Sequence, residues 1–355
     1  MKQDGLLDEL PSRFSKTAWG RIGAFCGALW MRLLLAPMEG LADDVLRDIL
    51  TRIGGYDWGV TEFVRVSGTL LPARSFRRIC PELERSSRTA AGTPVRVQLL
   101  GSDPSCLADN AGRLSELGPA GIDLNFGCPA PTVNRHRGGA ALLEEPELLH
   151  AITQAVRRAV SAEIPVTAKM RLGVRDTALT LDCARALADG GAEGLVVHAR
   201  TKADGYRPPA HWTWIGRVAE AVAIPVVANG EVWSEADWRR CRAESGVTDV
   251  MLGRGAVADP FLASRIRHGL PDSGRDPGAE WRCLESSVLD FWQQVGRKVA
   301  ARHAPGRLKQ WVNLLRRCYP GAQALWTQLR DARTAPDVSR ILAVSLVDPA
   351  ARLAA

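Results

Sequence analysis

Residues 121–126 read GIDLNF, and the loop that follows begins with Gly127-Cys-Pro and is rich in Arg and Gly as far as residue 142. A short apolar run bounded by turn residues is typical of a buried strand. Seven runs like it occur at 33–37, 58–63, 95–100, 165–170, 194–199, 225–230 and 249–254. The stretch at 121–126 is therefore one of eight similar units.

Helical segments separate these runs, as at 146–158 and 181–189, where Ala, Leu, Glu and Arg recur with helical periodicity. Nearly continuous apolar strands that alternate with helices predict a parallel sheet covered by helices. Eight such units over roughly 240 residues match the size of a (β/α)8 TIM barrel. We therefore predict an α/β fold of this kind.

Polar residues stand at the carboxyl ends of the predicted strands. They are Met38 and Glu39, Glu62, Gln98, Asn125, Lys169 with Arg171, His198 with Arg200, Asn229 to Glu231, and Gly253 to Gly255. Barrel enzymes build their active sites on that face. A purely structural sheet has little reason to repeat the pattern eight times, so we expect an active site there.

The chain is predicted to contain a second, smaller domain after the barrel. The breaker-rich stretch 268–279 reads as a linker, and residues 281–346 have helical patterning. In the segment 306–317 the polar and apolar residues fall on opposite helix faces. We expect a flexible N-terminal extension at 1–30, a barrel at 31–270 and a small C-terminal helical bundle domain at 280–355.

The positive charge is concentrated in that bundle. The chain has a formal net charge of +7, and residues 281–355 hold 12 Lys or Arg against 5 Asp or Glu, so the remainder is neutral. A basic tail on a neutral body indicates a polyanionic partner such as nucleic acid. A solvated helical surface explains the charge equally well.

Other partners and compartments have little support in the sequence. No apolar stretch approaches the roughly 18 residues that span a bilayer, so we expect no membrane partner. The 8 cysteines form no CxxC pair, so we expect no metal and reduced thiols in a cytoplasmic protein.

Two glycine-containing strand ends suggest a phosphate site. The sequence GRGAVA at 253–258 resembles a dinucleotide fingerprint, but it follows the eighth predicted strand and no later strand ends in an acid. In a barrel this position binds phosphate, with charge from Arg254. ANGE at 228–231 would form the other half. Together they favour a phosphorylated cofactor such as FMN.

Lys169 and His198 each have two interpretations. Lys169 either contacts a flavin ring or a phosphate, or lies at the rim with its amine in water, and Arg171 on the same strand face favours the first. His198 either is a hydrogen-bonded core residue or, beside Arg200, faces an anion.

Cys128 stands between a glycine and a proline where a strand ends. A single cysteine usually only packs, but an exposed turn at the catalytic face favours a chemical role. A thiol of ordinary pKa near 8.5 is mostly protonated at neutral pH, which suits a proton donor better than a nucleophile. A Cys-His hydrolase using His136 lacks an orienting residue.

These motifs together resemble the tRNA-dihydrouridine synthases. The resemblance runs over residues 31–345 and rests on LAPMEG (35–40), VQLLG (97–101), DLNFGCPAPTVNRHRGGAALL (123–143), KMRLG (169–173), VVHARTKADGYR (196–207), ANGE (228–231) and MLGRGA (251–256). TEFVRV (61–66), ICPEL (79–83) and GRLKQW (306–311) look closest to the bacterial C-type branch, which modifies uridine 16 of the D loop.

The resemblance implies an FMN-bound barrel that uses NADPH to reduce the uracil C5–C6 double bond. The flavin N5 would deliver hydride to C6, and Cys128 would protonate C5 of a uracil flipped out of folded tRNA. The residues implied for FMN are Pro37, Met38, Glu39, Gln98, Lys169, His198, Asn229, Gly230, Glu231, Gly253 and Arg254. Asn125, Arg171 and Tyr206 would line the uracil pocket, and Arg65, Arg307 and Lys309 would orient the tRNA.

Two alternatives remain open at this point. One is an FMN barrel reductase of a small pyrimidine or enone, against which the basic tail argues. The other is a tRNA-binding protein without chemistry, against which Cys128, Lys169 and the phosphate loops argue. For the tRNA-modifying enzyme we expect a monomer.

Overall fold

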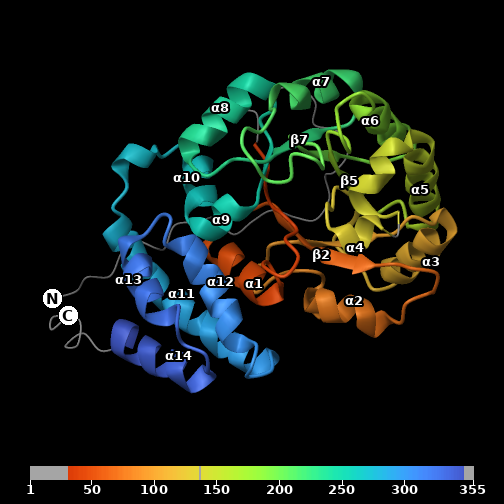
Figure 1. The fold of residues 1–355 in the computed structure, drawn as a ribbon. Coiled ribbons are helices and arrows are strands. Elements are labelled where there is room, and N and C mark those ends of the chain that lie inside the picture. Colours follow the sequence, from red (N-terminus) through yellow and green to blue (C-terminus); the bar gives the residue numbers. More distant parts are fainter. Residues whose placement is uncertain (1–30, 136, 348–355) are drawn as a thin grey trace, which may run out of the picture. The chain divides into compact units, whose positions relative to one another are not determined.

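A computed structural model describes residues 31–135 and 137–347 (Figure 1). The predicted extension at 1–30 lies outside the described residues. The strands are β1 (Leu33–Leu35), β2 (Trp58–Arg65), β3 (Val95–Leu100), β4 (Ile122–Phe126), β5 (Val166–Arg171), β6 (Leu195–His198), β7 (Val226–Asn229) and β8 (Val250–Leu252). They close in chain order into one parallel barrel, which confirms the predicted (β/α)8 fold.

Helices follow the strands and cover the outside of the barrel (Figure 1). They are α1 (Asp44–Ile53), α2 (Ala73–Ile79), α3 (Pro104–Ser115), α4 (Pro131–Asn134), α5 (Pro146–Ala159), α6 (Thr180–Asp189), α7 (Thr213–Ala221), α8 (Glu235–Ser245), α9 (Arg254–Ala258) and α10 (Leu262–His268). The helices predicted at 146–158 and 181–189 are thus confirmed to within a residue.

Alternation along the strands separates two hydrophobic layers. Leu33 and Leu35 of β1 pack outward against the helices, whereas Leu34 points into the barrel, where it belongs to a small cluster with Val60 and Met251. In β4, Ile122 and Leu124 belong to the outer layer, so Asp123 between them faces inward. The interior is therefore apolar near β1, β2 and β8 but polar at β4.

An irregularity in β2 contributes to the barrel mouth. The register against β3 shifts between Val60 and Phe63. There the Thr61 hydroxyl accepts a hydrogen bond from the Gln98 backbone N–H at 3.1 Å and donates to the Glu62 carbonyl at 2.7 Å. Bulges of this kind redirect side chains. Consecutive residues Glu62 and Phe63 both reach the cavity at the mouth.

In the described residues the C-terminal bundle consists of α11 (Pro277–Lys298), α12 (Ala304–Leu315), α13 (Pro320–Leu329) and α14 (Ala335–Leu342), with a π-helical turn at Ala343–Val347 after them. The predicted apolar face of α12 is confirmed, since Leu308, Trp311 and Leu315 are fully buried. Trp311 packs edge-on against Phe291 at 4.9 Å between ring centroids. Its indole N–H donates to the Val257 carbonyl of α9 at 3.2 Å, so this side chain joins bundle and barrel.

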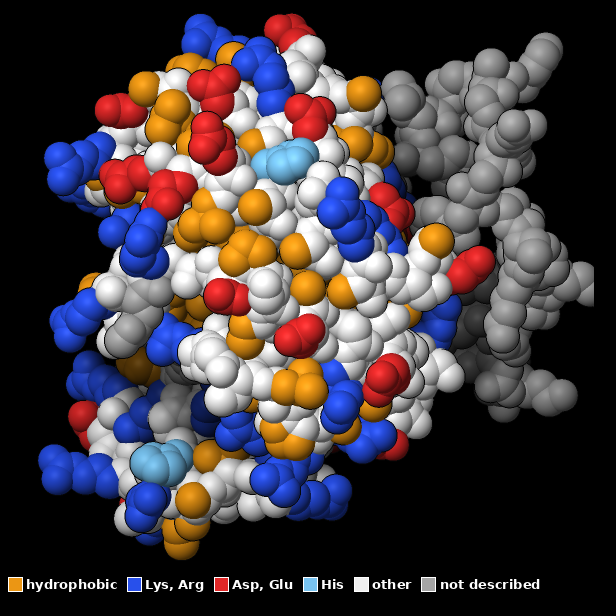
Figure 2. All heavy atoms as spheres, turned by 90° about the vertical axis from the view of Figure 1, so that its right-hand side faces the viewer, with side chains coloured by type: hydrophobic (Ala, Val, Ile, Leu, Met, Phe, Trp, Pro, Cys, Tyr) orange, Lys and Arg blue, Asp and Glu red, His pale blue; other side chains and the backbone are white. Residues whose placement is uncertain are grey.

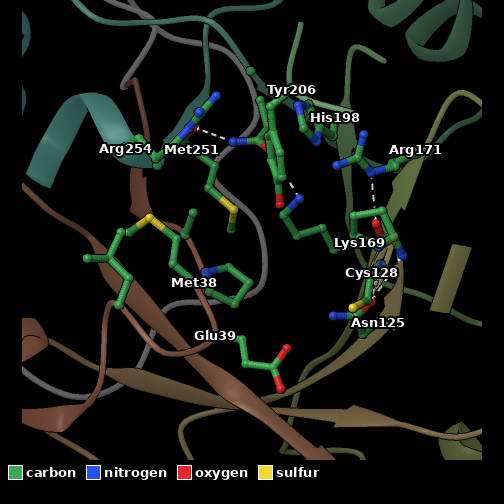
Figure 3. A pocket seen from close by; sticks show the side chains of 18 of the residues that line it. Met38, Glu39, Asn125, Cys128, Lys169, Arg171, His198, Tyr206, Met251 and Arg254 are labelled. Atoms are coloured by element: carbon green, nitrogen blue, oxygen red, sulfur yellow. Dashed lines mark hydrogen bonds between the residues drawn. The ribbon is translucent and has the colours of Figure 1, made fainter. Parts of the chain in front are cut away.

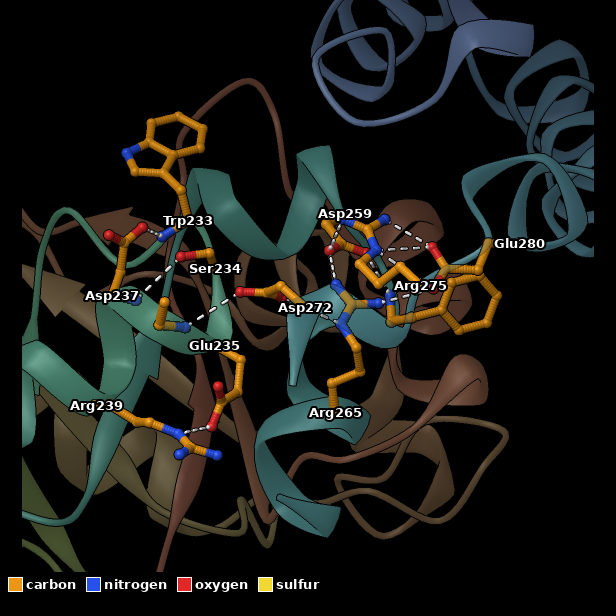
Figure 4. Close-up of polar contacts among 12 residues, drawn as sticks. Trp233, Ser234, Glu235, Asp237, Arg239, Asp259, Arg265, Asp272, Arg275 and Glu280 are labelled. Carbon is orange, nitrogen blue, oxygen red and sulfur yellow. Dashed lines mark hydrogen bonds and ion pairs between the residues drawn. The ribbon is translucent and has the colours of Figure 1, made fainter. Parts of the chain in front are cut away.

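The segment 268–279, which was predicted to be a linker, runs from the end of α10 to the first turn of α11. It contains a 3-10 turn at Asp272–Gly274, and its last three residues already belong to α11. Buried Asp259 pairs with Arg265 and lies 3.4 Å from Arg275, and it accepts a hydrogen bond from Tyr319 at 2.6 Å (Figure 4). This ionic cluster holds the connection against the barrel.

Charges are intermixed over the helical side of the barrel at the right of Figure 1, as Figure 2 shows. That distribution agrees with the neutral charge balance of the chain before residue 281. Among residues 31–135 and 137–347, no helix has the length and apolar character needed to cross a bilayer.

One buried ion pair gives a stability prediction for the barrel. Arg47 of α1 donates to Glu82 at 2.8 and 2.9 Å, and both side chains are buried. We expect Glu82→Ala to cost about 3–5 kcal/mol in urea unfolding, because it leaves the guanidinium buried and unpaired.

The matched control is Glu84→Ala in the same 3-10 turn, Pro81–Arg85. Glu84 pairs with Arg77, but the two side chains are 62% and 47% exposed, so we expect a change below about 1 kcal/mol. Equal losses in the two variants would contradict this account.

Candidate active site

A cavity of about 580 Å³ opens at the carboxyl ends of the strands. Residues from the ends of the strands line it, together with Gln310 of α12. Figure 3 shows Cys128 and Asn125 on one side and Arg254 on the opposite side, with Tyr206, His198 and Lys169 between them. The size is that of a typical cofactor or ligand site.

The loop after β4 holds Cys128 at the cavity edge. The side-chain oxygen of Asn125 accepts hydrogen bonds from the backbone N–H groups of Gly127 at 3.0 Å and Cys128 at 2.9 Å. The Cys128 carbonyl accepts from the Asn134 side chain at 2.8 Å and from the Ala140 N–H at 3.0 Å. The loop is thus fixed on both sides of the thiol.

A chain of amide hydrogen bonds runs from this loop to a buried carboxylate. Backbone N–H groups can only donate, so the Asn125 oxygen faces them and its NH₂ donates to the Gln98 oxygen at 2.7 Å. The Gln98 NH₂ then donates to Asp123 at 2.7 Å, and the Thr167 hydroxyl donates to the other carboxylate oxygen, also at 2.7 Å. Asp123 is the last acceptor in this series of hydrogen bonds and therefore fixes the direction in which each amide donates.

Burial raises the pKa of the Cys128 thiol, and the carboxylate of Glu39 adds to the effect. Arg171 and Arg65 act in the opposite direction without reversing the shift. The thiol therefore carries its proton throughout the neutral range. A protonated thiol at the edge of a cavity can donate a proton to a bound molecule.

Lys169 lies inside the barrel mouth, as the sequence predicted, and its amine donates to the Asn229 side chain at 3.0 Å. The Asn229 NH₂ donates to the Met251 carbonyl at 2.8 Å, which fixes the acceptor toward the lysine. Burial, followed by the Arg171 guanidinium, lowers the pKa of Lys169 to about 8. The amine stays mostly protonated at pH 7, but its charge is not balanced by an ion pair with a described carboxylate.

Arg171 ties the cysteine loop to the loop after β6. Its Nε donates to the Gly127 carbonyl at 2.8 Å, and one terminal nitrogen donates to the carbonyls of Thr201 at 3.0 Å and Gly205 at 2.8 Å. Burial lowers the pKa of this guanidinium, and Tyr206 and Asp204 act in the opposite direction without reversing the shift. Arg171 thus fixes two loops while keeping its charge at the cavity.

His198 is neutral at physiological pH. Burial lowers its pKa well below the ordinary value, and Lys169, Arg171, Arg200 and Arg254 lower it further. A neutral imidazole offers one hydrogen-bond donor and one acceptor.

Glycine at 230 is required by the same ring. A Cβ at that position would approach His198 Cδ2 to 2.8 Å, and the residue has a φ of 111°. The close approach of His198 and the positive φ explain why the ANGE motif has glycine at position 230.

The residue after this glycine, Glu231, has a φ of 63°, which non-glycine residues seldom adopt. Its carboxylate forms an ion pair with Arg200 and accepts from the Trp233 indole N–H at 3.3 Å. The Nη1 of Arg200 is buried and has no hydrogen-bond partner among the described residues. An unmatched donor beside a cavity indicates an acceptor-rich ligand.

The cavity as a whole suits an anionic ligand. Four cations, Lys169, Arg171, Arg200 and Arg254, line it, against the carboxylates of Glu39, Glu62 and Glu231, the last already paired with Arg200. Arg254 begins the short helix α9 directly after β8 and has no ion pair with a described carboxylate. A phosphate-bearing ring system fits this combination of cations, aromatic faces and unmatched donors.

The structure brings most of the predicted site residues together in this one cavity. They are Pro37, Met38, Glu39, Gln98, Asn125, Cys128, Lys169, Arg171, His198, Tyr206, Asn229, Gly230, Glu231, Gly253 and Arg254. Their roles in binding stay predictions. Tyr206 is 54% exposed, so its ring stands at the cavity entrance.

Three predicted residues lie outside that cavity. Arg65 lines a neighbouring hollow of about 300 Å³ that shares Glu39 and Phe63 with it. Arg307 pairs with Asp43 at 2.8 Å. Lys309 donates to the Arg330 carbonyl at 2.9 Å within the bundle.

The sequence interpretation did not assign several lining residues. Trp233, two positions after the ANGE motif, and Met251 of β8 had no signal beyond their closeness to a predicted strand end. Nothing in the sequence indicated Gln310, because only the packing of α12 on the barrel brings it to the mouth. No group of three or more His, Cys, Asp or Glu side chains in the described part of the chain could hold a metal ion.

Comparisons with known proteins show the family to which the chain belongs. A family model described as dihydrouridine synthase matches residues 34–343. A protein named tRNA-dihydrouridine(16) synthase from Aquipseudomonas alcaligenes is 60% identical over 316 residues, covering 89% of this chain and 100% of that protein. Proteins of the same name from Pseudomonas putida and Ralstonia nicotianae are 57% and 56% identical, covering 88% of this chain and 97% and 95% of theirs.

Among solved structures, histamine dehydrogenase from Rhizobium sp. 4-9 superimposes with a TM-score of 0.52 at 16% identity. The match covers 67% of this chain and 46% of that chain. At this identity the likeness concerns the barrel fold alone.

The amide chain gives a prediction for Asp123. We expect Asp123→Leu to destabilise the protein by about 1–3 kcal/mol in urea unfolding, because it leaves the Gln98 NH₂ buried without an acceptor. The freed Gln98 and Asn125 side chains should loosen the cysteine loop. Alkylation of Cys128 by iodoacetamide, followed by peptide mass spectrometry, should therefore become several-fold faster.

The control is Asp123→Asn, whose carbonyl can still accept from Gln98 while its NH₂ faces the Thr167 hydroxyl. We expect this variant to stay close to wild type in both measurements. Equal alkylation rates in the Leu and Asn variants would show that Asp123 does not order the loop.

The raised pKa of Cys128 predicts its pH dependence. Only the thiolate is alkylated, so labelling of Cys128 in the folded protein should be slow at pH 7 and should still be rising above pH 9. A plateau below pH 8.5 would mean that the thiol is activated rather than protonated, contrary to the shift described here.

Proposed function

The chain belongs to the dihydrouridine synthase family, and on that premise we propose that it reduces uridine 16 in the D loop of tRNA to 5,6-dihydrouridine. The observation that carries the proposal is the position of Cys128, a protonated thiol held at the edge of a cation-lined cavity opposite Arg254 (Figure 3). Such a group serves as a proton donor to a ring bound between the two sides.

FMN is the cofactor that we propose for this cavity. Three observations support this proposal. They are the Arg200 nitrogen without a hydrogen-bond partner, the close approach that Gly230 allows, and the charge of Arg254, which has no carboxylate partner among the described residues. The residues that would hold it are Pro37, Met38, Glu39, Gln98, Lys169, His198, Asn229, Gly230, Glu231, Gly253 and Arg254. When bound and reduced by NADPH, FMN supplies the hydride that C6 of uracil accepts.

The chain itself supplies the proton and the orientation. Cys128 gives its proton to C5 on the uracil ring, and the resulting thiolate regains a proton from solvent. Arg171 holds the Gly127 carbonyl, and Asn125 holds the two N–H groups beside the thiol, so the sulfur keeps its place during transfer. We propose that Asn125, Arg171 and Tyr206 also line the uracil pocket.

Recognition of tRNA is assigned to the basic bundle, residues 280–355, and to Arg65 at the neighbouring hollow. A stacked base cannot enter the cavity, so the uridine must be extruded from the D loop. Arg307 and Lys309 would contact the RNA backbone, where contacts contribute position and salt-dependent affinity rather than sequence reading. The monomeric state and the cytoplasmic location stay predictions.

The experiment that tests the activity separates its two half-reactions. We expect Cys128→Ala to bind FMN and to be reduced by NADPH at the wild-type rate in stopped-flow absorbance. Transfer to unmodified tRNA should fall by about 10²- to 10⁴-fold, the usual contribution of a general acid.

Cys283→Ala, which removes an exposed thiol of the bundle, is the control and should retain both half-reactions. Full transfer by Cys128→Ala, or a wild-type protein that cannot be loaded with FMN, would overturn the proposal. Mapping dihydrouridine in tRNA from a strain without the protein tests position 16, and loss at another uridine would refute that assignment.

A further inference from the structure

Arginine and aromatic side chains alternate from the cavity to the bundle. The Arg171 guanidinium lies 5.2 Å from the centroid of the Tyr206 ring, and Arg254 lies 4.6 Å from the same ring. Arg254 also lies 5.2 Å from Trp233, and Arg317 lies 4.3 Å from that indole. We call these five residues the arginine–aromatic ladder.

The ladder connects separate elements of the chain. Arg171 ends β5, Tyr206 lies in the loop between β6 and α7, and Trp233 lies between β7 and α8. Arg254 begins α9, and Arg317 lies in the turn that continues α12. The first four line the cavity, whereas Arg317 belongs to the bundle and lies next to its rim.

Helix α12 reaches the mouth at several points along its length. At its start Arg307 pairs with Asp43 in the loop after β1, and Gln310 lines the cavity. Arg317 lies two residues beyond the last residue of α12, and its guanidinium lies 4.3 Å from the ring of Trp233, which lines the cavity. The bundle therefore presents Arg317 to the catalytic mouth rather than to distant solvent.

The charge of Arg317 is not neutralised within the described chain. Arg307 has Asp43 as a partner, but Arg317 is exposed and forms no ion pair with a described carboxylate. Arg254, on the same indole, also lacks one, and burial together with Arg317 lowers its pKa. Two cations that share an aromatic ring and repel each other indicate a place for an anion.

We infer that Arg317 binds a phosphodiester group of the tRNA strand next to the extruded uridine, and that Trp233 positions it there. This inference rests on the proposed function, which assigns Arg254 to the cofactor and leaves Arg317 for a second anion. A guanidinium fits a phosphate with paired hydrogen bonds. The RNA is favoured over a free dinucleotide because Arg317 belongs to the segment that carries all of the net positive charge.

Binding of an unmodified tRNA transcript to the FMN-loaded protein tests the inference without requiring turnover. In fluorescence anisotropy at increasing salt, Arg317→Ala should weaken binding roughly tenfold near 0.15 M salt. It should also reduce the slope of log Kd against log salt by about 0.7–0.9, the share of one phosphate contact. FMN content and the rate of flavin reduction by NADPH should be unchanged.

Two further variants sharpen the test. Arg316→Ala removes the adjacent exposed arginine, which lies over Trp326 and bonds Asn313 within the bundle, so the loss of affinity and of slope should be much smaller than for Arg317→Ala. Arg317→Lys keeps the charge but not the planar fork, so the slope should be retained while part of the affinity is lost.

Three outcomes would overturn the inference. Equal losses of tRNA affinity in Arg316→Ala and Arg317→Ala would mean that tRNA binds a diffuse basic surface. Loss of bound FMN in Arg317→Ala would assign Arg317 to the cofactor. A higher NADPH concentration needed to reduce the flavin of Arg317→Ala would assign Arg317 to the reductant. Wild-type protein that binds tRNA but forms no dihydrouridine would defeat the proposed function while leaving the binding result intact.

Discussion

The active-site architecture depends on the one-way hydrogen bonding of the β4 loop. Backbone N–H groups at Gly127 and Cys128 can only donate, and a buried carboxylate at Asp123 accepts, so the amides of Asn125 and Gln98 between them have a single orientation. The position of the thiol follows from that orientation. Because every link is at least partly buried, a broken link leaves a polar group unsatisfied, which makes the arrangement specific as well as stable.

The same cavity concentrates positive charge that the protein does not neutralise. Lys169 has an amide oxygen rather than a carboxylate as its partner, and Arg171 is held by backbone carbonyls and by Tyr206 rather than by a carboxylate ion pair. Burial lowers the pKa of both, so the charged forms are held at a cost to folding stability. An anionic ligand would relieve that cost, which couples ligand binding to the stability of the barrel mouth.

The sequence predicted the strands and the strand-end residues well, because parallel strands place their carboxyl ends at one mouth whatever the loops do. It could not show that Lys309 bonds within the bundle while Gln310, the next residue, faces the cavity. Helical periodicity separates polar from apolar faces but does not say which polar residue meets another domain. In the same way, the breaker residues of 268–279 predicted a connecting segment. They did not predict that Arg275 in this segment would pair with Asp259 and Glu280.

The sequence alone determined the barrel, the face that carries the strand ends, and the position of Cys128 in a turn on that face. These features depend on apolar periodicity and on local motifs such as ANGE and Gly127-Cys-Pro. Only the tertiary structure decided which charges meet. Arg200 pairs with Glu231, and Arg254 and Arg317 both approach the Trp233 ring, so these contacts join residues from different loops and from the bundle. Electrostatic energy falls off with distance in space rather than along the chain, so no pattern in one dimension could reveal them.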